Sequence, residues 1–214
     1  MKTKSFKYWK SQEVDLTFGT WETKYNDFPL LLNWISIKAE IGKDEQIILE
    51  KLRQDAENFI TGWNEQDLIF FFISGIINLA RIYSPQKYRF FADHALKAEV
   101  EGYNLNGFAD LILASGKYEP IAPYFFLHEY KKEQNFEADP RGQLLAEMLA
   151  AQAINNNGKP IYGCYVIGRN WFFCVLSAKE YSFSLAYDCT KPEIFDIFRI
   201  LKGFKHILDT EILV

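Results

Sequence analysis

Cysteine is scarce in this sequence, and its spacing suggests neither a metal site nor a disulfide framework. The three cysteines, Cys164, Cys174 and Cys189, are odd in number and include no C-x-x-C pair. Close cysteine pairs mark metal and redox sites, and an even, larger number marks a disulfide-rich secreted domain. We therefore expect three reduced thiols in a cytoplasmic protein.

Long apolar runs are also absent. The longest, from Leu68 to Leu79, is interrupted by Ser74, Gly75 and Asn78, whereas a membrane-spanning helix needs about 18 or more apolar residues. The first six residues include lysines, but no apolar segment of a secretory signal follows them. The sequence thus predicts neither a membrane partner nor export.

The sequence lacks a glycine-rich phosphate loop and an excess of basic residues. The first absence argues against an ATPase, and the isolated His94, His128 and His206 form no triad with a serine or cysteine. With 24 Lys and Arg against 28 Asp and Glu, the net charge is −4. This balance disfavours a generic electrostatic grip on nucleic acid, but it permits a local basic rim around an acidic site.

Apolar and aromatic side chains, by contrast, are abundant. Of 214 residues, 49% are hydrophobic and 17% aromatic, which suffices for a packed core and argues against disorder. No repeat, low-complexity segment or linker divides the chain. We expect a single domain over residues 1–214, with a core at about 44–208 and an N-terminal helical extension at 1–43.

Two helices are expected before the first strand. Apolar residues at helical spacing predict one from residue 44 to Trp63, with its apolar face at Ile48, Leu52, Ala56, Phe59 and Trp63. Asn64, with Asp67 in the capping-box position, predicts a second helix to about Ile82. That helix is apolar on most faces, so we expect it to be central, with Gly75 allowing another element to approach closely.

Three strands should follow, over residues 88–100, 108–114 and 124–131, with a turn at 104–107 or a bulge near Gly107. The second and third are apolar on both faces, which is typical of central strands in a covered sheet. Asp139 and Pro140 predict the start of a helix that Gly158 closes.

The rest of the chain predicts a hairpin around Arg169 and Asn170, then a strand near residues 181–187. A capping box at residues 190–193 would open a last helix, to about Leu208. This order predicts an α/β protein with a central mixed β-sheet flanked by α-helices.

Charged side chains interrupt the two central strands. Side chains alternate along a strand, so Glu129 and Lys131 point to one face. Asp110 lies within the neighbouring apolar run, where an acid is costly to bury unless it is paired, hydrogen-bonded or bound to a cation. If the strands are adjacent, Asp110 and Glu129 converge beside Lys131. A divalent cation would relieve the repulsion between the two carboxylates.

The segment "GFAD" at residues 107–110, then 18 residues, then "EYK" at 129–131 and a helix with Gln143 resembles the PD-(D/E)XK nuclease superfamily. The chain also resembles an uncharacterised bacterial branch that shares "WNE", "EYKKE", "QLLAEMLAA" and "YGCYVIGRNW". The resemblance implies a restriction-endonuclease-like core and metal-dependent hydrolysis of phosphodiester bonds in DNA. Ala109 stands where the superfamily name has Pro, a position that varies among its members.

The resemblance also implies roles for individual residues. Asp110, Glu129 and the carbonyl of Tyr130 would bind Mg²⁺, for which Mn²⁺ would substitute, and Lys131 would orient the attacking water and offset developing charge. Gln143 would contact the water, the metal's shell or a phosphate. Glu65 is our candidate for the helical glutamate found in many members, with Glu57 second. A phosphate-binding rim would include Lys132, Arg141 and Arg169, and a homodimer is one expected assembly.

Each of these residues also has an ordinary structural interpretation. Asp110 would be a hydrogen-bonded buried acid, Glu129 and Lys131 an ion pair at the sheet edge, and Gln143 a polar residue in the first turns of a helix. Glu65 at a helix start is favoured by the helix dipole alone. Two further functions therefore remain open, a catalytically silent nucleic-acid- or protein-binding module and a purely structural partner.

Overall fold

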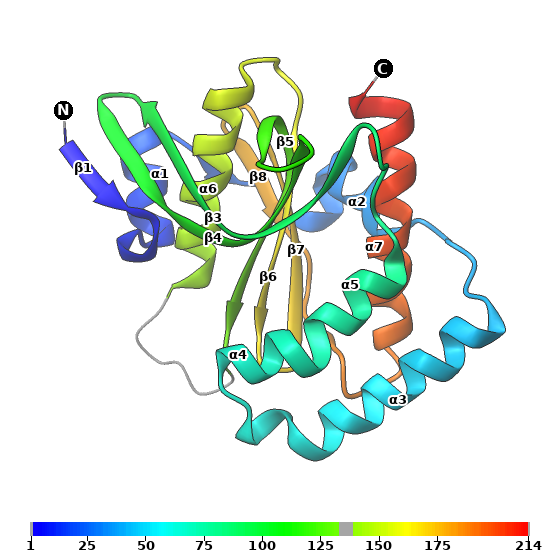
Figure 1. Cartoon of the computed structure of the whole chain (residues 1–214). Helices are drawn as coiled ribbons and strands as arrows, with labels where there is room; N and C mark the ends of the chain where they lie inside the picture. The colour runs from blue at the N-terminus through cyan, green and yellow to red at the C-terminus, as the bar shows by residue number, and fades with distance from the viewer. Residues whose placement is uncertain (1, 133–138, 214) are drawn as a thin grey trace.

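The computed structural model describes residues 2–132 and 139–213 of the chain. Within them, nine strands form one mixed sheet in the order β1-β4-β5-β6-β7-β8-β2, with β3 beside β4 and β9 beside β7 (Figure 1). The strands are β1 (Lys2–Ser5), β2 (Trp21–Glu22), β3 (Tyr88–Val100), β4 (Tyr103–Ser115), β5 (Ile121–Lys131), β6 (Ile161–Ile167), β7 (Asn170–Ser177), β8 (Glu180–Phe183) and β9 (Tyr187–Asp188).

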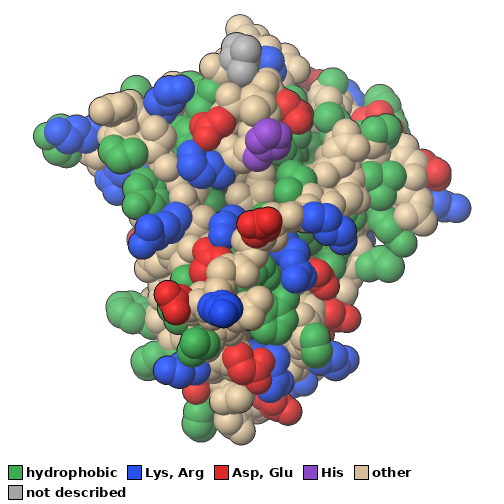
Figure 2. All heavy atoms as spheres, turned by 90° about the vertical axis from the view of Figure 1, so that its right-hand side faces the viewer, with side chains coloured by type: hydrophobic (Ala, Val, Ile, Leu, Met, Phe, Trp, Pro, Cys, Tyr) green, Lys and Arg blue, Asp and Glu red, His purple; other side chains and the backbone are tan. Residues whose placement is uncertain are grey.

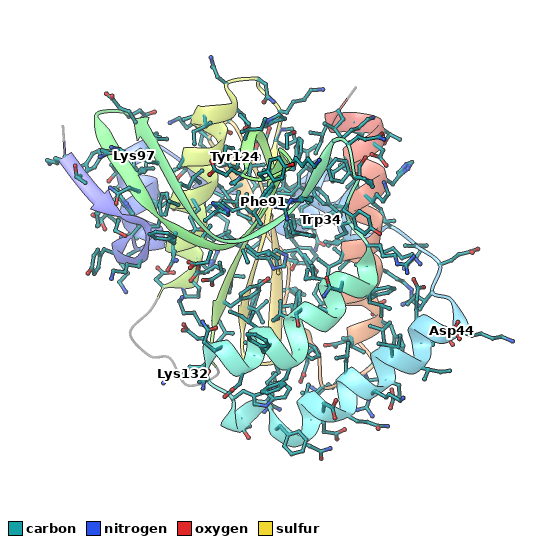
Figure 3. All side chains as sticks on the ribbon, in the orientation of Figure 1. Trp34, Asp44, Phe91, Lys97, Tyr124 and Lys132 are labelled. Atoms are coloured by element: carbon teal, nitrogen blue, oxygen red, sulfur yellow. The ribbon has the colours of Figure 1, made fainter. Side chains whose placement is uncertain are left out.

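Helices cover both faces of this sheet, as the sequence predicts. They are α1 (Ser11–Phe18), α2 (Pro29–Ile35), α3 (Lys43–Phe59), α4 (Glu65–Leu68), α5 (Ser74–Ala80), α6 (Pro140–Asn155) and α7 (Ile194–Ile207), with a wider turn at η4 (Ile69–Ile73) joining α4 to α5. One apolar cluster lies between the sheet and α6 with α1. The other lies beneath α2, α3, α5 and α7, and Trp34 is fully buried within it (Figure 3).

Two different strands, β1 and β5, pair with successive parts of the same edge of β4, and the gap between them positions the candidate site. The first part of β4 pairs with β1 up to Asn106, and its last part pairs with β5 from Leu111 onward. Between them, residues 107–110 have no ladder partner on this edge among the described strands. Asp110 therefore lies where β5 diverges from β4.

Helix α6 connects β5 to the parallel strand β6 and packs on both. Asp139 caps it by accepting a hydrogen bond from the Gly142 amide at 3.0 Å, and Pro140 occupies its first turn, as predicted. The same Asp139 side chain accepts a hydrogen bond from the Ser11 amide at 2.8 Å. The N-terminal segment is thus fastened to the start of the helix that carries Gln143.

The N-terminal extension is not only helical, which corrects the expectation for residues 1–43. Strand β1 pairs with β4 and β2 pairs with β8, both in parallel. These short edge strands lack a periodic pattern of their own because distant partners provide their hydrogen bonds.

The turn expected at residues 104–107 is also wrong, and so is its alternative, a bulge near Gly107, because the β3–β4 register does not shift there. The chain reverses at Glu101 and Gly102, and β4 runs unbroken through Gly107, whose φ is 154°. A Cβ on Gly107 would lie 2.7 Å from Cδ2 of Phe6, so glycine is needed there for close packing as well as for its backbone angle.

The helices before the first strand differ from prediction in what they bury. The Asn64–Asp67 capping box is present, and Leu52 approaches Gly75 closely, as predicted, with its Cδ2 3.0 Å from where a Cβ on Gly75 would lie. However, Ile48 and Phe59 are exposed, and so are Phe70 and Phe71 at η4. The segment 64–82 therefore packs one face on the core, where Leu68, Phe72 and Ile76 are buried, and leaves its other face in solvent, so it is not enclosed on most faces as expected.

Near the C-terminus, the strand predicted at 181–187 is two short strands, β8 and β9, with a break between them. The capping box expected at Thr190 does not form. Glu193 instead accepts a hydrogen bond from the Asp188 amide at 2.6 Å, and α7 begins at Ile194.

Candidate functional site

Asp110 and Glu129 lie on neighbouring antiparallel strands, as predicted from the two apolar runs. Pairing between β4 and β5 ends at Leu111 and His128, so the amide of Tyr130 has no strand partner on β4. The Asp110 carboxylate takes its place and accepts a hydrogen bond from the Tyr130 amide at 2.8 Å. Asp110 is thereby fixed against the backbone of the E-x-K segment.

Glu129 and Lys131 form an ion pair on one face of β5, between Glu129 Oε1 and Lys131 Nζ. The Lys131 ammonium also donates to the Tyr130 carbonyl at 3.1 Å, and it lies 4.0 Å from a carboxylate oxygen of Glu65. The Glu129 side chain is completely buried, whereas Lys131 is partly exposed. This is therefore a fully buried acid paired with a lysine whose side chain is only 14% exposed, not the edge ion pair of the structural interpretation.

Gln143 joins the site from α6. Its amide Nε2 donates to Glu129 Oε2 at 2.6 Å and to Glu147 Oε1 at 3.1 Å. At 8% exposure, the Gln143 side chain faces the site rather than solvent.

Sequence reasoning missed Glu147. It lies one helical turn after Gln143 and is fully buried, and its Oε2 has no hydrogen-bond partner among the described residues. The signal was present, because Glu147 is the one acid within the otherwise apolar stretch from Leu144 to Ala151. An acid in the middle of a buried helix face is costly unless it is paired.

The three acids share an environment that disfavours ionisation. Burial, with a contribution from the charge of Asp110, raises the pKa of Glu129 to about 8 against the pull of Lys131. Burial also raises the pKa of Asp110, and burial together with Glu129 raises the pKa of Glu147 well above its usual range. Burial lowers the pKa of Lys131, but Glu129, Glu65 and Asp110 outweigh it and the net direction is upward. Lys131 therefore remains a cation beside acids that cannot all ionise together.

The oxygen atoms at this point suit a hard cation. Carboxylates and backbone carbonyls are the ligands that Mg²⁺ prefers, and Mg²⁺ keeps several waters, so few protein ligands are needed. Two of the expected donors, the Glu129 carboxylate and the Tyr130 carbonyl, are the acceptors that Lys131 contacts. The Lys131 ammonium group already contacts both of these acceptors, so a metal ion held by them would compete with it.

Across the described ranges, no cluster of three or more His, Cys, Asp or Glu side chains is arranged to hold a metal ion. Glu65 lies near Lys131 and acts on Asp110 and Glu129 through its charge. Glu57, the second choice, is instead exposed and paired with Arg53 at 2.9 Å.

The three residues expected at a phosphate-binding rim do not share one environment. Lys132 is exposed just after β5 (Figure 3), and the hairpin of Arg169 is adjacent, since the Gly168 amide donates to the Lys131 carbonyl at 2.9 Å. Arg141 instead pairs with Glu22 at 2.7 Å and stacks over the ring of Phe183. The positive charge of Arg141 is thus neutralised by Glu22 rather than presented to a phosphate.

The chain matches no protein-family model, and no curated protein is significantly similar to it. Among the described helices, none is long and apolar enough to cross a membrane.

Proposed function

We propose that this protein is a metal-dependent nuclease of the PD-(D/E)XK type, which hydrolyses phosphodiester bonds in DNA. One observation carries the proposal: Asp110, Glu129 and Glu147 converge with Lys131 and Gln143 where β5 leaves β4. Burying Glu129 and Glu147, with Asp110 partly buried beside them and only one lysine nearby, lowers stability, and such arrangements concentrate at functional sites.

The order of elements around the site also supports the proposal. A helix precedes the antiparallel strands β3, β4 and β5, and α6 then leads to β6, which is parallel to β5. This order supports the restriction-endonuclease-like core that the resemblance implies.

In the proposed reaction, a water oxygen forms a new bond to phosphorus, one bridging P–O bond breaks, and the leaving oxygen takes up a proton. Mg²⁺ held by Asp110, Glu129 and the Tyr130 carbonyl would polarise the phosphate. Lys131 would orient the water and offset charge on the phosphoryl oxygens. Gln143 would hold Glu129 in place through the hydrogen bond at 2.6 Å.

The second candidate is a catalytically silent binding module with the same fold. It is favoured by the contacts of Lys131, whose ammonium group already satisfies both Glu129 and the Tyr130 carbonyl without any metal. Metal binding and cleavage separate the two candidates.

The activity test compares wild-type protein with Lys131→Ala on single-stranded, double-stranded and branched DNA and on RNA. We expect cleavage of DNA with Mg²⁺ or Mn²⁺, and none with EDTA. Lys131→Ala should lower the rate by about two orders of magnitude, on the order of 3 kcal/mol of transition-state stabilisation.

The matched control is Lys97→Ala, which removes an exposed lysine on β3, away from the site (Figure 3). It should cleave like the wild type. Equal rates for wild type and Lys131→Ala would refute the mechanism, and no wild-type cleavage on any of the four substrates would favour the silent module.

Asp110→Asn tests the metal site separately from cleavage. We expect Mn²⁺ binding, measured by calorimetry, to be lost, while metal-free thermal stability at pH 8 rises because a buried, repelled carboxylate is removed. An asparagine oxygen can still accept the hydrogen bond from the Tyr130 amide. Asp55→Asn, at an exposed position on α3, is the control. Unchanged Mn²⁺ binding in Asp110→Asn would withdraw Asp110 as a ligand.

A further inference from the structure

A cavity of about 510 Å³ opens beside the candidate site, between the α4–α5 segment and the β3–β4 hairpin. Its volume is within the range of small-molecule sites. Ile69, Ile73 and Ile77, four residues apart along one helical face, line one wall, and Phe90 and Leu111 contribute to the strand side. The cavity therefore has apolar side chains on both its helical side and its strand side.

The wall next to the candidate site is polar. Asp110 and Tyr130 both line the cavity, so it is continuous with the residues expected to bind a metal. The Tyr130 side chain is 2% exposed, and its hydroxyl has no hydrogen-bond partner among the described residues. The buried hydroxyl is out of reach of a ligand in the cavity, so Asp110 is the polar group on this wall that such a ligand would meet.

The remaining charges around the cavity are positive. Arg81, Arg89 and Lys117 line it, all three are exposed, and Asp110 is the only acid among the lining residues. The Arg89 guanidinium donates to the carbonyls of Lys117 and Tyr118 and stacks on Phe91, contacts that leave its charge unneutralised. In a chain with a net charge of −4, this local excess favours an anionic ligand.

We propose that this cavity binds an unpaired nucleotide, with the base between the apolar walls and its phosphate among the cations. A base supplies an apolar face for the walls and hydrogen-bonding edges for Asp110, and its phosphate pairs with the cations, which a neutral hydrocarbon chain would leave unpaired. The base must be unstacked to enter. In this arrangement, the phosphodiester next to the bound nucleotide would lie at the Asp110 site, an assignment that rests on the proposed nuclease function. Single-stranded DNA would then be the preferred substrate.

The test is calorimetric binding of dAMP and dCMP to the metal-free protein in EDTA. Ser74→Phe and Ile77→Trp fill the cavity from an exposed and a buried position on its helical wall. Each should weaken binding by about tenfold or more. Ile47→Trp adds the same ring at an exposed position on α3 outside the lining, and should bind like the wild type. Melting temperatures report folding, and Ser74→Phe keeps the test decisive if Ile77→Trp misfolds.

The proposal is overturned if neither nucleotide binds saturably, if both filled variants bind like the wild type, or if decanoate binds while dAMP does not. Where DNA cleavage is found, single strands should be cut faster than duplex, and Ser74→Phe should remove that preference. The two proposals fail separately. Nucleotide binding without cleavage leaves the cavity assignment standing without the nuclease, and cleavage without nucleotide binding does the reverse.

Discussion

At the scale of single residues, the candidate site holds more carboxyl groups than its one lysine can neutralise. Gln143 joins Glu129 to Glu147, so two buried carboxyl groups share one amide donor. The amide satisfies one oxygen of each and leaves Oε2 of Glu147 without a partner among the described residues. Proton uptake or a bound cation are the two ways to relieve such a cluster.

Glu129 predicts how stability depends on pH. Its folded-state pKa is about 8, against 4.5 when unperturbed. Below pH 4.5 the Glu129 carboxyl is protonated in both the folded and the unfolded protein, and its full contribution to folding stability is present. As pH rises toward 8, the unfolded state loses its proton first, so stability falls. We expect metal-free wild type to lose on the order of a few kcal/mol between pH 5 and pH 8, and Glu129→Gln to lose less.

Urea unfolding in EDTA at several pH values measures this difference. Glu99→Gln, at an exposed position on β3, should follow the wild type. Parallel curves for wild type and Glu129→Gln would show that Glu129 is ionised in the folded protein.

At the scale of elements, α6 is the part on which the site depends. It brings Gln143 and Glu147 to β5, and its first turn is held by the N-terminal segment. Gly142 allows this contact, because a Cβ there would lie 2.6 Å from backbone atoms of Trp9, Lys10 and Ser11. Backbone at that distance cannot move aside as a flexible side chain would.

We therefore expect Gly142→Ala to destabilise the protein by about 1–3 kcal/mol, even though alanine favours a helix by about 1 kcal/mol over glycine. Gly62→Ala is the matched control, because nothing lies within 4 Å of its added Cβ. That change should stay within about 0.5 kcal/mol of the wild type. Chemical denaturation of both variants gives the comparison. Equal stabilities would mean that the N-terminal segment does not press on α6.

At the scale of the whole molecule, the first residues are part of the core rather than an appendage. Four large side chains from this segment are buried against the α6 face of the sheet, namely Phe6, Trp9, Val14 and Phe18. Charged groups, in contrast, are mixed on the surface, and basic and acidic side chains alternate over the face in Figure 2. The described residues of that face form no large basic patch that would attract nucleic acid in general (Figure 2). In the proposed function, recognition of a nucleotide would therefore depend on the cations that line the cavity.

Deleting residues 1–24 should prevent cooperative folding. Burying each large apolar side chain contributes about 1.5–3 kcal/mol, and domains are stable by only about 5–15 kcal/mol in total. Near-ultraviolet circular dichroism and urea unfolding of the shortened chain test this expectation. A sharp unfolding transition with native aromatic signals would show that residues 25–214 fold independently.

The sequence by itself determined the features that depend on neighbours along the chain. Helical spacing, the caps at Asn64 and Asp139 and the apolar runs around Asp110 and Glu129 predict the main elements and the adjacency of the two strands that carry these acids. Capping and periodicity act over a few residues, so they can be read locally.

Only the tertiary structure decided which distant groups meet. Strands β1 and β2 exist because β4 and β8 complete their hydrogen bonds, about 100 and 160 residues further along the chain. Glu147 joins the site, Arg141 turns to Glu22, and Phe70 faces solvent for the same reason. Each outcome is set by contacts between segments that are remote in sequence, and such contacts leave no periodic trace in the residues that make them.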